Sequence, residues 1–148
     1  MSLLLIKPEH DIWQPAQHNG TFRGNTLAFV SARAAINTFW KNTDFSNDIK
    51  RKGNIIRNSL RDISTNNKEF GLEVRGKGMI NGLVFEDESI AAQARRLAFD
   101  KGMIIELCGA RDEVLKVMPP LTVNDEDLSA GMAIISVVID ELASKHSH

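Results

Sequence analysis

Polar groups that can hold an anion are concentrated in one stretch near the N-terminus, residues 18–25. The stretch reads His-Asn-Gly-Thr-Phe-Arg-Gly-Asn, and helix-forming sequence follows from Leu27 to about Lys41. At such a loop–helix junction, free backbone N–H groups and the positive end of the helix dipole both attract negative charge. The stretch therefore predicts an anion-binding loop, and an ordinary turn is the alternative.

A second candidate for chemistry is Lys116, a cation near the end of an apolar segment. The segment, residues 114–118, predicts a strand that stops at Pro119-Pro120, because proline cannot donate to a strand ladder. A lysine at this position either extends its ammonium to solvent or meets a carboxylate. The spacing leaves both alternatives open.

Other reactive residue types lack the patterns that their chemistry needs. His10, Asp11 and His18 match no metal-ligand spacing, so no metal site is expected. Residues 76–78, Gly-Lys-Gly, lack the spacing of a phosphate-binding loop and predict a turn with positive φ. The single cysteine, Cys108, rules out an internal disulfide and is typical of packing beside a strand.

The composition is that of a globular protein with one main core. The 148 residues are 43% apolar and 25% charged, and the net charge is −1. A net charge near zero gives no positive electrostatic field that would attract nucleic acid. The apolar run at residues 3–6 is too short for a membrane span. We expect a cytoplasmic protein with no nucleic-acid or membrane partner.

The elements that would position these residues indicate an α+β fold. From about residue 45 onward the pattern predicts a self-contained unit: a small mixed or antiparallel sheet with helices on one face. The apolar start, residues 1–6, predicts a buried strand. The other predicted elements are helices at 27–40, from 45, at 89–100 and after the N-cap Asn124, a hairpin at 72–85, and strands at 103–107 and 114–118.

Four blocks in order resemble the class III aminotransferases, which use pyridoxal phosphate. Residues 18–25 are similar to the family's HGTT(F/Y)GGNPLA segment, and residues 74–79 to its VRGKGL hairpin. Residues 98–102 resemble one of the family's helix ends, and residues 114–121 resemble its (I/L)R(F/L).PPL strand. Within the family, the first and last blocks look closest to the enzymes that act on diaminobutyrate and 2-oxoglutarate at the start of ectoine synthesis.

The resemblance also implies what this chain lacks. Family members are longer, and the matching part is their C-terminal portion, so residues 1–40 would be a remnant of the large cofactor-binding domain. Residues 41–148 would be the small C-terminal domain of a fold-type I pyridoxal-phosphate transferase. The lysine that binds the cofactor covalently would lie upstream. We therefore expect no catalytic residue in this chain, which should be inactive by itself and should not bind the cofactor alone.

Site residues follow from the resemblance only where positions match. Gly20 and Thr21 fall on the segment that holds the cofactor phosphate, reaching across the interface of a homodimer or higher oligomer. Lys116 falls where many relatives have an arginine that binds the substrate carboxylate. A lysine ammonium, which is a compact point charge, therefore replaces a guanidinium that can bind the carboxylate with two hydrogen bonds. The alternative function is a non-catalytic α+β module, for binding or oligomerisation, that shares the small-domain fold.

Overall fold

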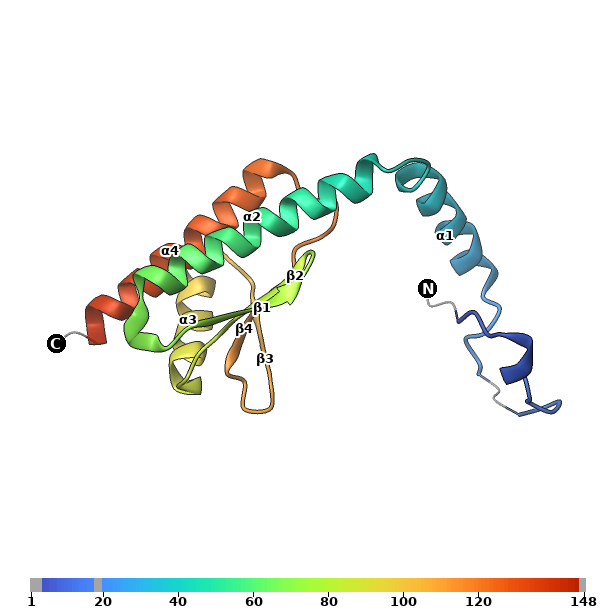
Figure 1. Cartoon of the computed structure of the whole chain (residues 1–148), viewed down its shortest axis with the longest axis horizontal. Helices are drawn as coiled ribbons and strands as arrows, with labels where there is room; N and C mark the ends of the chain where they lie inside the picture. Colours follow the sequence, from blue (N-terminus) through green and yellow to red (C-terminus); the bar gives the residue numbers. More distant parts are fainter. Residues whose placement is uncertain (1–3, 18–19, 147–148) are drawn as a thin grey trace. The chain divides into compact units, whose positions relative to one another are not determined.

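A computed structural model describes residues 4–17 and 20–146 (Figure 1). The chain divides into two compact units, Met1–Phe45 and Ser46–His148, which we describe separately. Met1–Leu3, His18 and Asn19 lie outside the described residues, so part of the predicted N-terminal strand and of the anion-binding stretch falls there.

The first unit contains a short 3-10 helix, η1 (Pro8–His10), and the helix α1 (Thr26–Phe39). The predicted N-cap is confirmed, because the Asn25 side chain accepts a hydrogen bond from the Ala28 N–H at 3.1 Å. The predicted strand is wrong for residues 4–6, which are exposed and irregular. A strand needs a hydrogen-bonded neighbour, and the described part of the chain offers none there.

Helix α1 is apolar on more than one side, yet every one of its residues is at least partly exposed. Leu27 is 79% exposed and Val30 is 62% exposed. An apolar helix of this kind is normally stabilised by burial against other elements. The side chains of α1 therefore form a surface that suits burial against further protein.

The second unit combines helices with a small antiparallel sheet. This confirms the predicted α+β fold class. Within the described residues, the strands form a single sheet in the order β1-β2-β4-β3, and every neighbouring pair is antiparallel. The elements are α2 (Asp44–Asn66), η2 (Lys68–Phe70), β1 (Glu73–Lys77), β2 (Ile80–Val84), α3 (Glu88–Asp100), β3 (Glu106–Cys108), β4 (Val114–Val117) and α4 (Asp125–His146).

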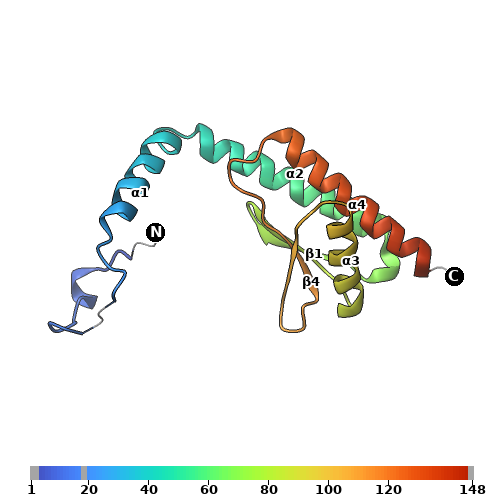
Figure 2. The same cartoon turned by 180° about the vertical axis from the view of Figure 1, so that it is seen from behind.

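The core lies between one face of the sheet and the helices. Leu83 of β2 pairs with Leu115 of β4, and both side chains are fully buried. Helices α2 and α4 run side by side in both views (Figures 1 and 2). Their buried side chains join those of α3 and the sheet in one cluster. The largest fully buried members are Ile56, Leu60, Leu83, Phe85, Leu115, Ile135, Val138, Ile139 and Leu142.

The predicted turn and caps of this unit are confirmed. Gly78 in the β1–β2 turn has φ of +60°, which favours glycine over other residues. The Asn124 side chain accepts a hydrogen bond from the Asp127 N–H at 2.7 Å at the start of α4. Across the described ranges, no helix has the length and apolar character needed to cross a membrane.

The predicted strand at residues 103–107 is shifted in the structure. Strand β3 spans Glu106–Cys108, and Met103, Ile104 and Ile105 are outside it. The partner strand β4 ends at Val117, ahead of Pro119-Pro120. Continuing the register of Glu106 with Lys116 would set Met103 opposite Pro119, which has no N–H to donate, and residues 103–105 lie outside the paired region.

Candidate functional site

The loop before α1 is a turn that presents Thr21 to solvent. The Arg23 N–H donates to the Gly20 carbonyl at 3.1 Å, which closes the turn, and Gly24 has φ of +68°. Gly20 and Thr21 are both exposed. The loop is therefore a turn and also leaves a hydroxyl free to face a ligand.

Lys116 lies on the face of the sheet that the helices do not cover. Its neighbours in β4, Leu115 and Val117, point into the core and are buried. Lys116 is half-buried and sits directly opposite Gly82 of β2 and Glu106 of β3. In the described part of the chain it forms no ion pair, so its charge is available to a ligand.

Lys116 also lines a groove of about 510 Å³. The groove lies at the start of β3 and the end of β4, beside the first turns of α4, and Ile104, Glu106 and Met118 contribute to its wall. Asp127 lines it from α4. A volume of this order suits a small organic ligand.

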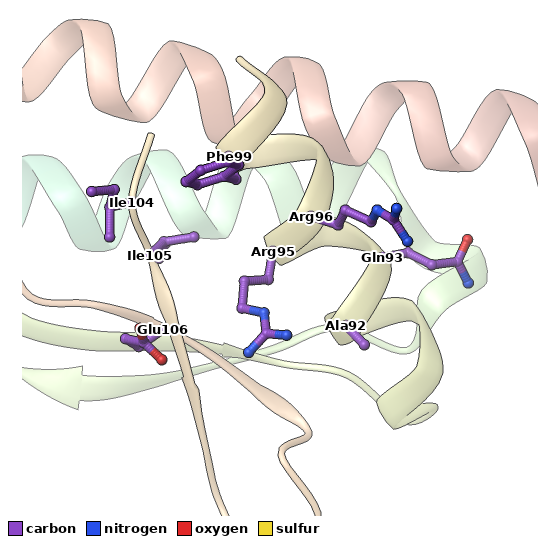
Figure 3. Close-up of a pocket in the computed structure, with 8 residues that line it drawn as sticks. All are labelled: Ala92, Gln93, Arg95, Arg96, Phe99, Ile104, Ile105 and Glu106. Atoms are coloured by element: carbon purple, nitrogen blue, oxygen red, sulfur yellow. The ribbon is translucent and has the colours of Figure 1, made fainter. Parts of the chain in front are cut away.

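A second groove, of about 670 Å³, lies between α3 and residues 104–106 (Figure 3). Arg95 points from α3 into this groove, and the Phe99 ring lies near Ile104 (Figure 3). Phe99 is 67% exposed and Ile104 is 83% exposed. Glu106 lines both grooves, so the segment that ends in Glu106 separates them.

Another cation on the open face of the sheet, Arg75, is already occupied. Its guanidinium donates two hydrogen bonds to Glu73, at 3.0 and 2.7 Å. This contact lowers the pKa of the Glu73 carboxyl from its usual value and raises that of Arg75. The Arg75 guanidinium is therefore already paired with Glu73.

A separate charged network joins the start of α2 to the start of α4. Asp48 accepts from Lys52 at 2.5 Å and from Arg51 at 2.6 Å, and Arg51 also contacts Asp125 at 2.7 Å. The Lys52 and Arg51 hydrogen bonds lower the pKa of Asp48. The Lys52 side chain is only 8% exposed, which makes this network a structural clamp.

The predicted site residues occupy two separate parts of the chain. Gly20 and Thr21 belong to the first unit, and Lys116 belongs to the second. Sequence reasoning missed Glu106, because its place opposite Lys116 depends on the length of the turn between β3 and β4. Within the described residues, no group of three His, Cys, Asp or Glu side chains is placed to hold a metal ion.

Comparison with curated proteins identifies relatives of known class. The chain is 45% identical over 146 residues to a diaminobutyrate–2-oxoglutarate transaminase from Bordetella parapertussis, covering 98% of this chain and 34% of the relative. It is 40% identical to the Nocardia farcinica enzyme of the same name, over 97% of this chain and 33% of that one. The chain thus spans about a third of the length of these relatives.

Solved structures share the fold. The acetylornithine aminotransferase of Elizabethkingia anophelis superposes with a TM-score of 0.73 at 27% identity, covering 88% of this chain and 34% of that chain. A lysine aminotransferase from M. tuberculosis gives 0.74 at 21% identity, over 84% of this chain and 28% of that chain. The aminotransferase class-III family matches residues 7–139. The chain therefore belongs to the class III aminotransferases.

Proposed function

We propose that this chain is the C-terminal part of a transaminase that moves an amino group between diaminobutyrate, or a similar ω-amino acid, and 2-oxoglutarate. The main support is the 45% identity, over 98% of the chain, to a relative that bears the name of this reaction. In this proposal residues 1–40 belong to the large domain and residues 41–148 form the small domain. The exposed apolar surface of α1 supports a position against further protein.

Class III aminotransferases are pyridoxal-phosphate enzymes. When bound, the cofactor supplies an electron sink for the amino-transfer chemistry. The residues present fit one part of it: the exposed Thr21 hydroxyl and the turn at Gly20 lie just before the N-terminus of α1, where a phosphate dianion is favoured. The lysine that binds the cofactor covalently belongs, in this proposal, to the preceding part of a longer enzyme.

Thr21 would act across a subunit interface. As the family resemblance implies, its hydroxyl would donate to the cofactor phosphate in the partner's site of a homodimer. The loop would then be one wall of a shared site. A Thr21→Ala variant keeps the turn, which depends on the Gly20 carbonyl and the Arg23 N–H, and removes only the hydroxyl.

Lys116 would hold a substrate carboxylate. Its ammonium lies on the open face of the sheet, without an ion-pair partner among the described residues, and lines a groove of suitable size. An ammonium is a compact point charge that makes no fixed fork with a carboxylate. Binding by Lys116 is therefore less dependent on carboxylate orientation than binding by an arginine.

The first experiment uses the chain as it is. The purified 148-residue chain, mixed with pyridoxal phosphate, diaminobutyrate and 2-oxoglutarate, should form no glutamate beyond that formed in the same mixture without the chain. Turnover by the chain itself would contradict the proposal that it is only part of the enzyme.

The second experiment restores a complete enzyme. The preceding part of the Bordetella parapertussis relative is fused to this chain in place of its own C-terminal part, and the chimera should transaminate diaminobutyrate. Thr21→Ala should increase cofactor loss on dialysis, and Lys116→Met should raise KM for the carboxylate substrates. Lys77→Met, which removes an exposed cation from β1, is the matched control. It should change neither the cofactor loss on dialysis nor KM for the carboxylate substrates. A folded, cofactor-binding chimera with no turnover would reject the proposed reaction.

A non-catalytic module is the second candidate. The observation that favours it is that the second unit has a core of its own. If the chain is such a module, the chimera will stay inactive and the chain will form a defined oligomer by sedimentation. An active chimera removes this candidate.

A further inference from the structure

Two opposite charges lie side by side on the open face of the sheet. Glu106 of β3 pairs in register with Lys116 of β4. Directly opposed residues of an antiparallel pair have Cβ atoms about 4.5–5.5 Å apart and side chains on the same face. Yet these two form no ion pair with each other or with any other described residue. Lys116 and Glu106 therefore lie side by side, and neither charge is paired with another described residue.

The surroundings keep this pair open on the sheet face. On the other side of Lys116 lies Gly82, which has no side chain, and a methyl group of Val114 leans over it. Beyond Gly82, Arg75 is held by Glu73. No neighbouring side chain in this row therefore neutralises Lys116.

The same pair lines one groove. Both residues line the 510 Å³ groove at the end of the sheet, and its wall also includes the apolar residues Ile104 and Met118. Glu106 is exposed and Lys116 is half-buried, so both residues are accessible from solvent beside the groove. The lining of the groove thus includes one cation, Lys116, two carboxylates, Glu106 and Asp127, and apolar residues.

We infer that Lys116 and Glu106 form a recognition pair for the zwitterionic head of an α-amino acid. The substrate carboxylate binds the Lys116 ammonium, and the α-ammonium on the same carbon binds the Glu106 carboxylate. This inference rests on the proposed function and makes it more specific. For a diamino acid, the pair holds the head group and leaves the distal amine free to react. Glu106 then distinguishes diaminobutyrate from 4-aminobutyrate, which has a carboxylate but no α-ammonium.

Binding to the chain itself tests the recognition pair, because the second unit has its own core. In an NMR titration of the 15N-labelled chain, L-2,4-diaminobutyrate should shift the backbone amides of Gly82, Glu106 and Lys116. It should bind at least about fivefold more tightly than 4-aminobutyrate, about 1 kcal/mol. Glu106→Gln should abolish that preference. Lys116→Met should weaken the binding of both diaminobutyrate and 4-aminobutyrate.

Glu73→Gln is the matched control, because Glu73 lies on the same face of the sheet but is paired with Arg75. It should keep the preference for diaminobutyrate. The inference is overturned if Glu106→Gln keeps the preference too, or if the shifted amides map away from β3 and β4.

The chimeric enzyme separates this inference from the proposed function. In an active chimera, Glu106→Gln should lower the ratio of kcat/KM for diaminobutyrate to that for 4-aminobutyrate, and an unchanged ratio would overturn the inference while the function stands. If the chimera is inactive but the NMR preference depends on Glu106, the pair stands as a binding site and the proposed reaction fails.

Discussion

Gly53 of α2 lies directly against the carbonyl group of Gly78 in the β1–β2 turn. A Cβ atom at residue 53 would come within 2.5 Å of the Gly78 oxygen, closer than real Cβ atoms approach a backbone oxygen. The contact fixes how closely α2 packs on the hairpin. Glycine is otherwise unfavourable inside a helix, so its presence at residue 53 is explained by this close approach.

Gly53→Ala should therefore destabilise the second unit. Forcing the helix away from the turn should cost about 1–3 kcal/mol, more than the gain in helix propensity of about 1 kcal/mol. The measurement is the free energy of unfolding in urea. Gly131→Ala in α4 is the control: its Cβ would meet only a Met103 methyl, at 3.8 Å, so that variant should be neutral or more stable. Equal effects of the two variants would contradict the packing argument.

Asp48→Asn should weaken the clamp between α2 and α4 and change its pH dependence. The Lys52 hydrogen bond, and then that of Arg51, lowers the pKa of Asp48 in the folded state. A lowered folded-state pKa contributes stability above the unfolded value of about 3.9 and loses it as the pH falls through the folded value. The variant should be less stable at pH 7 and should lose less stability than the unchanged chain as the pH falls below about 4.

The control for the clamp is Asp125→Asn, since the Asp125 side chain is 62% exposed and contacts only the outer cation, Arg51. Surface pairs of this kind contribute little. Urea unfolding across the pH range should show a smaller change for this variant. If Asp125→Asn reproduces the effect of Asp48→Asn, the burial of Lys52 has no role.

Asn124→Ala should destabilise α4 at its N-terminus. The Asn124 side chain accepts the Asp127 N–H at 2.7 Å, and losing such a cap costs about 1 kcal/mol. Thermal unfolding followed by circular dichroism measures the effect. Asn58→Ala, at an exposed position inside α2, should leave stability unchanged or increase it, because alanine is the better helix former. A stabilised Asn124→Ala would show that the cap is dispensable.

Leu115→Ala tests which face of the sheet is the core. Leu115 is fully buried between the sheet and the helices, so its truncation should cost about 2–5 kcal/mol. Ile80→Ala is the comparison: Ile80 is 57% exposed, and its loss should cost no more than about 1 kcal/mol. Free energies of unfolding that rank the other way would reverse the assignment of the two faces.

The sequence predicts much of this fold because many of its signals are local. The N-caps Asn25 and Asn124, the glycine turn at Gly78 and the apolar stripe of α4 each depend on residues within a few positions of one another. The end of β4 is also predicted locally, because Pro119 and Pro120 have no backbone N–H to extend the strand. Local chemistry of this kind needs no knowledge of the tertiary structure.

What depends on distant partners could not be predicted in the same way. The strand order places β4 between β2 and β3, and only this order brings Glu106 and Gly82 to either side of Lys116. The predicted strand at 103–107 is confirmed at Glu106 and Leu107 and wrong at residues 103–105, because its extent depends on where its partner ends. The irregular course of residues 4–6 has a similar cause, since a strand depends on a neighbour.

The alternation of Leu115, Lys116 and Val117 also has a consequence for the folding process. If β4 slipped by one residue against β2, Leu115 and Val117 would turn outward and the Lys116 ammonium would enter the core, at a large desolvation cost. Misaligned sheets are therefore rejected while the chain folds. The charge that we propose for ligand binding also selects the correct register of the sheet that carries it.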